Sequence, residues 1–196
     1  MKISDYIIEF LLEKKINKVF GYVGGAVAHI YHSIGKYDDM EIINCINEQG
    51  AGFAAEGYAR VSGNSGVAIA TSGPGATNLI TAIGSCYFDS VPTLFITGQV
   101  NTYEYKYDRP VRQIGFQETD IVSIVKPIVK YAVMVDSMNR IKYELEKAYY
   151  ISQNGRKGPV LVDIPMDIQR NEVDINNSES FYDSQEYKQL AFKNNN

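Results

Sequence analysis

A chain of 196 residues is long enough to form one sizeable domain and too short for two ordinary ones. Its net charge of −4 and the lack of any basic block argue against a nucleic acid partner. The composition is globular, with 45% hydrophobic and 21% charged residues. Because no apolar run approaches the roughly 20 residues of a membrane span, we expect a cytoplasmic protein without membrane contact.

The cysteines and histidines carry no sign of a disulfide or a metal site. Cys45 and Cys86 lie in apolar segments, which favours reduced core residues. Together with His29 and His32 they give no zinc-ligand spacing. The amphipathic N-terminus has acids inside its apolar stretch, which is typical of a first helix and not of a signal peptide.

Helix-like and strand-like segments alternate along most of the chain. Ser4 is predicted to cap a first helix that runs to about Lys15. Short apolar strands are predicted at residues 18–22, 41–46, 66–71, 91–98, 130–135 and 158–165. Between them we expect one helix that ends at Gly35 and further helices over residues 48–61, 76–87, 118–125 and about 137–152. Ser137 is predicted to cap the last of these.

This alternation predicts an α/β fold, a doubly wound three-layer sandwich with about six mainly parallel strands and helices on both faces. In such folds ligands bind beyond the carboxyl ends of the strands. The unusual residues of the sequence follow strands at that edge, at 22–25, 47–49, 71–75 and 98–99. The topology alone therefore predicts that they gather on one rim of the sheet.

Glu48 opens a helix rich in small residues directly after an apolar run that we expect to be a buried strand. One interpretation is ordinary capping, in which Asn47 caps the helix and the acid complements the helix dipole. In the other, Glu48 faces a ligand across a low-polarity shell of glycine and alanine. The residues by themselves leave both interpretations open.

The glycine turn SGPGATN, residues 72–78, partly matches a dinucleotide-binding fingerprint. Asn78 stands in place of the third glycine, Pro74 removes a backbone donor, and the next strand ends in Gly98 and Gln99 without an acid to hold a ribose. A nucleotide site is therefore the less favoured interpretation of this turn.

Six motifs follow one another along residues 4–167: VFGYVGGAVAHIY, NEQGAGFAAEGYAR, GVAIATSGPGATNLITAI, DSVPTLFITGQV, FQETDIVSIVKPIVKY and GRKGPVLVDIP. Together they resemble the N-terminal pyrimidine-binding domain of thiamine-diphosphate enzymes, and most of all that of the acetolactate synthase (acetohydroxyacid synthase) large subunits. Each motif alone is weak, whereas six in register are specific.

The resemblance implies the roles of individual residues. In that family a glutamate, here Glu48, hydrogen-bonds N1′ of the aminopyrimidine and activates the cofactor, which needs a carboxylate in a fairly dry pocket. Val23 stands where the family usually has proline. The implied catalytic residues are Glu48 and Gln117, and the implied cofactor-binding residues are Val23, Gly24, Gly25, Glu48, Pro74, Asn78, Phe116 and Gln117.

The resemblance also implies the reaction. The complete enzyme would decarboxylate a 2-oxo acid, with pyruvate as the first expectation, and join the product to a second carbonyl compound. The chain lacks the paired histidines of the pyruvate decarboxylase branch, which favours carboligation. A related decarboxylase, a carboligase of a specialised pathway and a non-catalytic nucleotide-binding module remain the alternatives. Arg112 either recognises an acidic or sugar-derived substrate or, as we favour, forms a surface ion pair.

In this family a C-terminal domain with an Asp-Gly…Asn motif holds the diphosphate and Mg²⁺, and this sequence has no such motif. The active site forms between domains of two subunits. The chain is therefore expected to supply half a site, and to need a diphosphate-binding domain of the same or a partner chain in a homodimer or homotetramer. Whether FAD also binds stays open.

Two segments are expected from the composition. Residues 1–170 would form the pyrimidine-binding domain. Residues 171–196 have the composition of a linker, and we expect a tail that leads towards a middle domain and has no packing element of its own. A fragment and a natural split subunit both fit this pattern.

Overall fold

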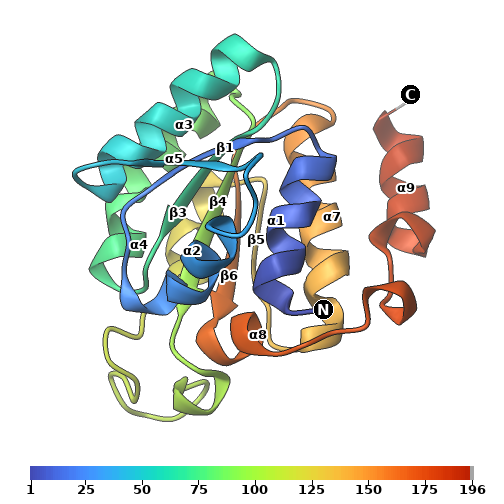
Figure 1. Cartoon of the computed structure of the whole chain (residues 1–196). Helices are drawn as coiled ribbons and strands as arrows, with labels where there is room; N and C mark the ends of the chain where they lie inside the picture. The colour runs from blue at the N-terminus through green and yellow to red at the C-terminus, as the bar shows by residue number, and fades with distance from the viewer. Residues whose placement is uncertain (195–196) are drawn as a thin grey trace.

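The computed structural model describes residues 1–194 and places six parallel strands in one sheet between two layers of helices (Figure 1). The sheet order is β2-β1-β3-β4-β6-β5. The strands are β1 (Lys18–Gly21), β2 (Glu41–Asn44), β3 (Gly66–Ala70), β4 (Thr93–Gln99), β5 (Tyr131–Met134) and β6 (Val160–Pro165). The predicted α/β doubly wound three-layer fold is confirmed.

The helices fall on the two faces of the sheet. They are α1 (Ile3–Glu13), α2 (Ala28–Ile34), α3 (Glu48–Ser62), α4 (Pro74–Asn78), α5 (Ile80–Asp89), α6 (Ile121–Val125), α7 (Ile141–Gln153), α8 (Met166–Arg170) and α9 (Gln185–Asn194). One apolar cluster lies between the sheet and α1, α2, α7 and α8, and a second lies between the sheet and α3 to α6. None of the helices within residues 1–194 is long and apolar enough to cross a bilayer.

Burial differs between the centre and the edge of the sheet. Every residue of β3, β4 and β6 is buried, which explains why these strands are continuously apolar instead of alternating. In contrast β2 is an edge strand, in which Glu41 and Asn44 are exposed. The expectation of a buried strand before Glu48 is therefore wrong, because only one neighbour, β1, pairs with β2.

The small residues of α3 allow close packing. A Cβ on Gly52 would lie 2.6 Å from Cβ of Ala82 in α5, and one on Gly66 at the start of β3 would overlap the backbone of Ala55. Larger side chains at these places would push α3 away from both neighbours. The glycine- and alanine-rich sequence that follows Glu48 is thus explained by packing as well as by any ligand.

Several element boundaries differ from the predicted ones because side chains serve distant contacts. Ser4 does not cap α1: the helix begins one residue earlier, and the Ser4 hydroxyl accepts a hydrogen bond from Ser33 (2.8 Å). Ser137 makes no capping hydrogen bond with its side chain. The helix predicted at 76–87 is two helices that meet at Leu79, and the one predicted at 118–125 begins at Ile121.

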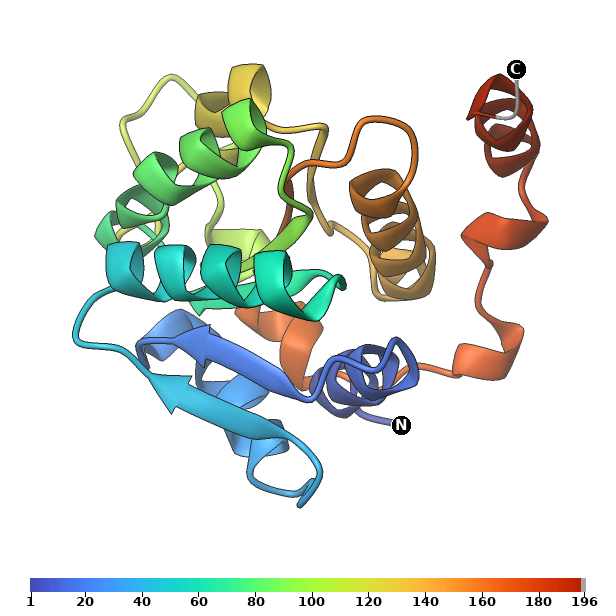
Figure 2. The same cartoon turned by 90° about the horizontal axis from the view of Figure 1, so that it is seen from above.

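The segment after α8 does pack, so the expectation of a tail without a packing element is wrong. Phe181 is fully buried, and its ring meets those of Tyr143 and Tyr150 of α7 edge-on or tilted. Glu146 of α7 accepts hydrogen bonds from the backbone of Phe181 (2.8 Å) and the hydroxyl of Ser180 (2.7 Å). Helix α9 follows outside α7, away from the sheet (Figure 2). The domain boundary at residue 170 stays a prediction.

Candidate functional site

Loops from four neighbouring strands meet at the carboxyl edge of the sheet. Gly24 and Gly25 follow β1, Glu48 follows β2, Thr71 follows β3, and the long loop 100–120 follows β4 and projects below the sheet in Figure 1. Parallel strands bring these segments to one rim, as the alternation of helices and strands implies.

Glu48 lies in the first turn of α3 but does not cap it. The cap of α3 is Asn47, whose side chain accepts a hydrogen bond from the backbone of Gly50 (2.8 Å). The Glu48 carboxylate is only 8% exposed and accepts a hydrogen bond from Nδ2 of Asn78 in α4 (2.9 Å). Within residues 1–194, Asn78 is the only hydrogen-bond donor to this carboxylate. Because a carboxylate can accept about four hydrogen bonds, Glu48 retains capacity for a ligand.

Two glycines allow close backbone packing around Thr71, and one of them also beside Glu48. A Cβ on Gly75 would lie 3.1 Å from Oε1 of Glu48 and 2.7 Å from Cγ2 of Thr71. One on Gly24 would lie 2.6 Å from the same Thr71 methyl group. Thr71 also accepts a hydrogen bond from the backbone of Ala26 (3.1 Å), so it joins the loops after β1 and β3. The sequence placed Thr71 on the rim, within residues 71–75, but indicated no role for it.

A cavity of about 270 Å³ lies on the other side of Thr71. Its walls are formed by the loops after β1, β3 and β4 and by the start of α8: Gly25, Ala26, Thr71, Ser72, Val100, Asn101, Glu104, Phe116, Gln117 and Met166. The Phe116 side chain is 81% exposed at this wall, and Gln117 is half-buried. Glu48 does not line the cavity, so Thr71 separates the Glu48 cluster (Glu48, Asn78 and Gly75) from the cavity.

Gln117 is held in an unusual conformation. Its φ is 58° and that of Gly73 is 63°, both in the left-handed region. A Cβ on Gly73 would lie 2.7 Å from Cβ and 2.8 Å from the carbonyl oxygen of Gln117, so only glycine fits there. Such backbone conformations are most frequent at functional sites.

The remaining predicted residues lie at the edge of this region. Val23 is 55% exposed, Pro74 is exposed at the first position of α4, and Gly25 has open space where a Cβ would stand. Arg112 is exposed and forms no ion pair with any carboxylate of residues 1–194, so the favoured interpretation of a surface ion pair is wrong for this part of the chain.

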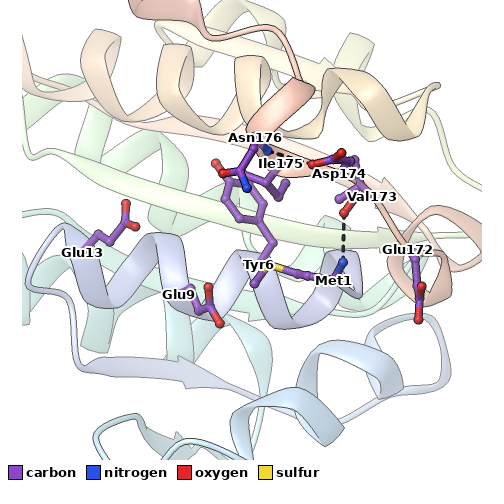
Figure 3. A pocket seen from close by; sticks show the side chains of 9 residues that line it. All are labelled: Met1, Tyr6, Glu9, Glu13, Glu172, Val173, Asp174, Ile175 and Asn176. Carbon is purple, nitrogen blue, oxygen red and sulfur yellow. Dashed lines mark hydrogen bonds between the residues drawn. The ribbon is translucent and has the colours of Figure 1, made fainter.

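A larger cavity, of about 540 Å³, lies elsewhere, between α1 and residues 172–176 (Figure 3). Carboxylates line it and no basic side chain does: they belong to Glu9, Glu13, Glu172 and Asp174. This cavity therefore does not suit an anionic ligand, and it is remote from the Glu48 rim. Nor do any three His, Cys, Asp or Glu side chains in the described residues converge to hold a metal ion.

Asp163 is a buried carboxyl near the rim that the sequence analysis missed. It is 1% exposed and accepts hydrogen bonds from the hydroxyl of Thr97 (2.7 Å) and from Nε2 of Gln99 (2.8 Å). Burial raises the pKa of Asp163 to about 7, although both hydrogen bonds lower it. Gln99 also donates to the carbonyl of Thr119 (2.8 Å), so the network ties β6 and β4 to the loop 100–120. An acid inside the apolar run VLVDIP was the available signal.

Asp163 predicts a pH dependence of stability. Its pKa rises from the ordinary 3.8 to about 7 on folding, so its protonated form stabilises the fold. That contribution is complete below about pH 4 and is lost as the pH rises through about 7. Between about pH 5 and pH 7 the group lowers the free energy of unfolding by about 2 kcal/mol. In Asp163→Asn this decrease should disappear, because asparagine does not titrate. The hydrogen bonds should be kept, since the amide can accept from Gln99 and donate to Thr97.

Urea unfolding followed by circular dichroism at several pH values measures this effect. Asp39→Asn, which removes an exposed carboxylate, is the matched control and should keep the decrease of the parent protein. Parallel pH profiles for Asp163→Asn and the parent protein would contradict the prediction.

Comparison with known proteins places the chain in a family. Residues 1–124 match the sequence profile of the N-terminal TPP binding domain of thiamine pyrophosphate enzymes. The chain belongs to this family. Thiamine pyrophosphate is another name for thiamine diphosphate, so the resemblance carried by the six motifs is confirmed. This N-terminal TPP binding domain is also similar to several acetolactate synthases.

Three relatives illustrate the similarity. The acetolactate synthase isozyme 3 large subunit of Escherichia coli (strain K12) is 40% identical over 165 residues, which are 84% of this chain and 28% of that protein. The chloroplastic acetolactate synthase of Arabidopsis thaliana is 42% identical over 170 residues, 85% of this chain and 24% of that protein. The acetolactate synthase large subunit of Corynebacterium glutamicum is 45% identical over 169 residues, 86% and 26% respectively. The N-terminal TPP binding domain thus spans about a quarter of the length of these relatives.

Proposed function

We propose that this chain binds the aminopyrimidine ring of thiamine diphosphate at the Glu48 cluster and serves an acetolactate synthase-like enzyme. One observation carries the proposal: Glu48 is buried, accepts from one neutral donor within residues 1–194, and lies against the backbone of Gly75, where no side chain intervenes. A flat ring with one basic nitrogen suits such surroundings, because it needs close backbone approach and one acidic partner.

Each residue of the rim then has a role. Glu48 would share a proton with N1′ of the ring, and Asn78 would hold the Glu48 carboxylate in place. Gly24 and Gly25 allow the backbone to approach the ligand, with Val23 and Pro74 at the rim. Bound thiamine diphosphate supplies the electron sink that lets a 2-oxo acid lose carbon dioxide. Of the residues implied for catalysis and binding, Phe116 and Gln117 would form the substrate wall, since they line the neighbouring cavity.

The chain would supply half of an active site. The diphosphate and its Mg²⁺ would lie on a further domain, of the same chain or of a partner in a homodimer or homotetramer. Two apolar side chains beside the rim support a covering partner, since Ile46 is 96% and Phe116 81% exposed. FAD would be bound outside this chain, if at all, and the complete protein would act in the cytoplasm.

The structure does not favour the nucleotide-binding alternative. The backbone of Gln117 lies over Gly73, where a Cβ would already come within 2.8 Å of its carbonyl oxygen. A phosphate would need the same space above the turn. In addition, α4 has only five residues, too few to give its N-terminus the full helix dipole.

The test is acetolactate formation from pyruvate by the complete protein, supplied with thiamine diphosphate, Mg²⁺ and FAD. Acetolactate is the expected product. Acetaldehyde in its place would identify a decarboxylase, and unconsumed pyruvate would direct the search to another 2-oxo acid. Failure to bind thiamine diphosphate in isothermal titration calorimetry of the complete protein would overturn the proposal as a whole.

A further inference from the structure

A buried carboxylate holds the loop that carries Phe116 and Gln117. Glu118 is 8% exposed and accepts three backbone hydrogen bonds. One oxygen accepts from Lys106 (2.9 Å), and the other accepts from Ile114 (2.7 Å) and Gly115 (3.3 Å). Within residues 1–194 no cationic side chain pairs with it. Backbone amides alone therefore compensate its charge.

These hydrogen bonds join the two arms of the loop 100–120. Lys106 lies on the arm that leaves the sheet, whereas Ile114 and Gly115 lie on the arm that returns. The outgoing arm has anchors of its own, since Asp167 accepts from the backbone of Thr102 (2.9 Å). The amide of Gly115 also donates to the carbonyl of Glu104 on the outgoing arm (2.9 Å). Glu118 reinforces this link through Lys106 and holds the returning arm at Ile114, next to the exposed segment 108–114.

The returning arm is held tightly on both sides of Gln117. A Cβ on Gly115 would lie 2.6 Å from Cγ1 of Val100, so the chain passes directly over the end of β4. Beyond Glu118, the carbonyl of Thr119 accepts from Gln99 (2.8 Å). Gln117 lies between these two contacts, with its left-handed backbone against Gly73.

We propose that Glu118 is a positioning residue that holds Gln117 at the wall of the cavity by anchoring the returning arm of the loop. The anchoring follows from the hydrogen bonds; its importance for turnover rests on the proposed function. A carboxylate is required because both of its oxygens accept. The amide of glutamine would direct its NH₂ group at backbone N–H donors on one side.

Amide hydrogen exchange in the full chain tests the anchoring. In Glu118→Gln the amides of Lys106 and Ile114 should exchange about 10- to 100-fold faster than in the parent protein. Amides of β4 should keep their protection, as should that of Gly115, which also donates to the carbonyl of Glu104 (2.9 Å). Asp108→Asn removes an exposed carboxylate from the same loop and should change none of these rates. Unchanged exchange at the amides of Lys106 and Ile114 in Glu118→Gln would overturn the proposal.

Kinetics of the complete protein test the consequence. Glu118→Gln should lower kcat about tenfold or more and leave the KM for thiamine diphosphate within about twofold, because Gln117 and not the Glu48 cluster is displaced. Faster exchange with an unchanged kcat would overturn the role of Glu118 in turnover. If the complete protein forms no acetolactate, the proposed function fails, while the exchange experiment still decides the anchoring. Should Glu118→Gln not fold, Glu118→Asp, which withdraws the carboxylate by one methylene, takes its place with the same expected results.

Discussion

Glu48→Gln is expected to lower acetolactate formation by the complete protein by about 10²- to 10⁴-fold, the usual contribution of a group that transfers a proton. Glutamine has nearly the same shape, but its amide has a single oxygen. In the structure one oxygen of the Glu48 carboxylate accepts from Asn78, and the other, Oε1, lies close to the backbone of Gly75. The variant can therefore accept a hydrogen bond from Asn78 or from the ligand, but it has no acidic proton to share with the ligand.

The measurement is kcat with pyruvate, together with calorimetric binding of thiamine diphosphate to the same variant. Glu56→Gln is the matched control, because Glu56 is an equally buried acid two turns further along α3 that pairs with Arg60 (2.6 Å) and not with the rim. It should lower stability and leave kcat within about twofold. Equal turnover by Glu48→Gln and the parent protein would refute the role assigned to Glu48.

Gly98→Ala is expected to destabilise the fold by about 1–3 kcal/mol, or to prevent folding, because the new methyl group has no room. The Cβ would overlap the carbonyl group of Ala26 and lie 2.8 Å from Cγ1 of Val27. Ala26 cannot withdraw freely, since its carbonyl oxygen accepts a hydrogen bond from buried Gln169 (2.7 Å) and its amide donates to Thr71 (3.1 Å). The substitution would thus displace the loop after β1 that carries Gly24 and Gly25.

Urea unfolding of the chain measures the change. Gly57→Ala is a comparison variant in which the free energy of unfolding should change in the opposite direction. Gly57 lies in the exposed middle of α3, and nothing lies within 4 Å of its ideal Cβ. Alanine there should stabilise the protein by about 0.5–1 kcal/mol, because it restricts the unfolded chain and favours the helix. If Gly98→Ala leaves the unfolding midpoint unchanged or raises it, the steric account of Gly98 is wrong.

The sequence-based predictions that the structure contradicts share a physical cause. Ser4 is of a residue type that often caps helices, but it forms a hydrogen bond with Ser33. Glu118 lies where a helix was predicted to begin, but its carboxylate holds a loop. Phe181 lay in a segment of linker composition, yet it packs against two tyrosines of α7. In each case a residue distant in the chain satisfies the side chain, and local propensity carries no information on such a partner.

The sequence by itself determined the layer architecture, the parallel sheet and the rim on which the unusual residues gather, because apolar periodicity and the rules of chain connection are local or general. The order of six motifs also determined the family. Only the tertiary structure decided which rim residues touch. Asn78 reaches Glu48 across 30 residues and Thr97 reaches Asp163 across 66, distances over which contact depends on strand register and on the packing of crossover helices. Asn78, Thr71, Asp163 and Glu118 therefore acquire their roles from neighbours that no local pattern reveals.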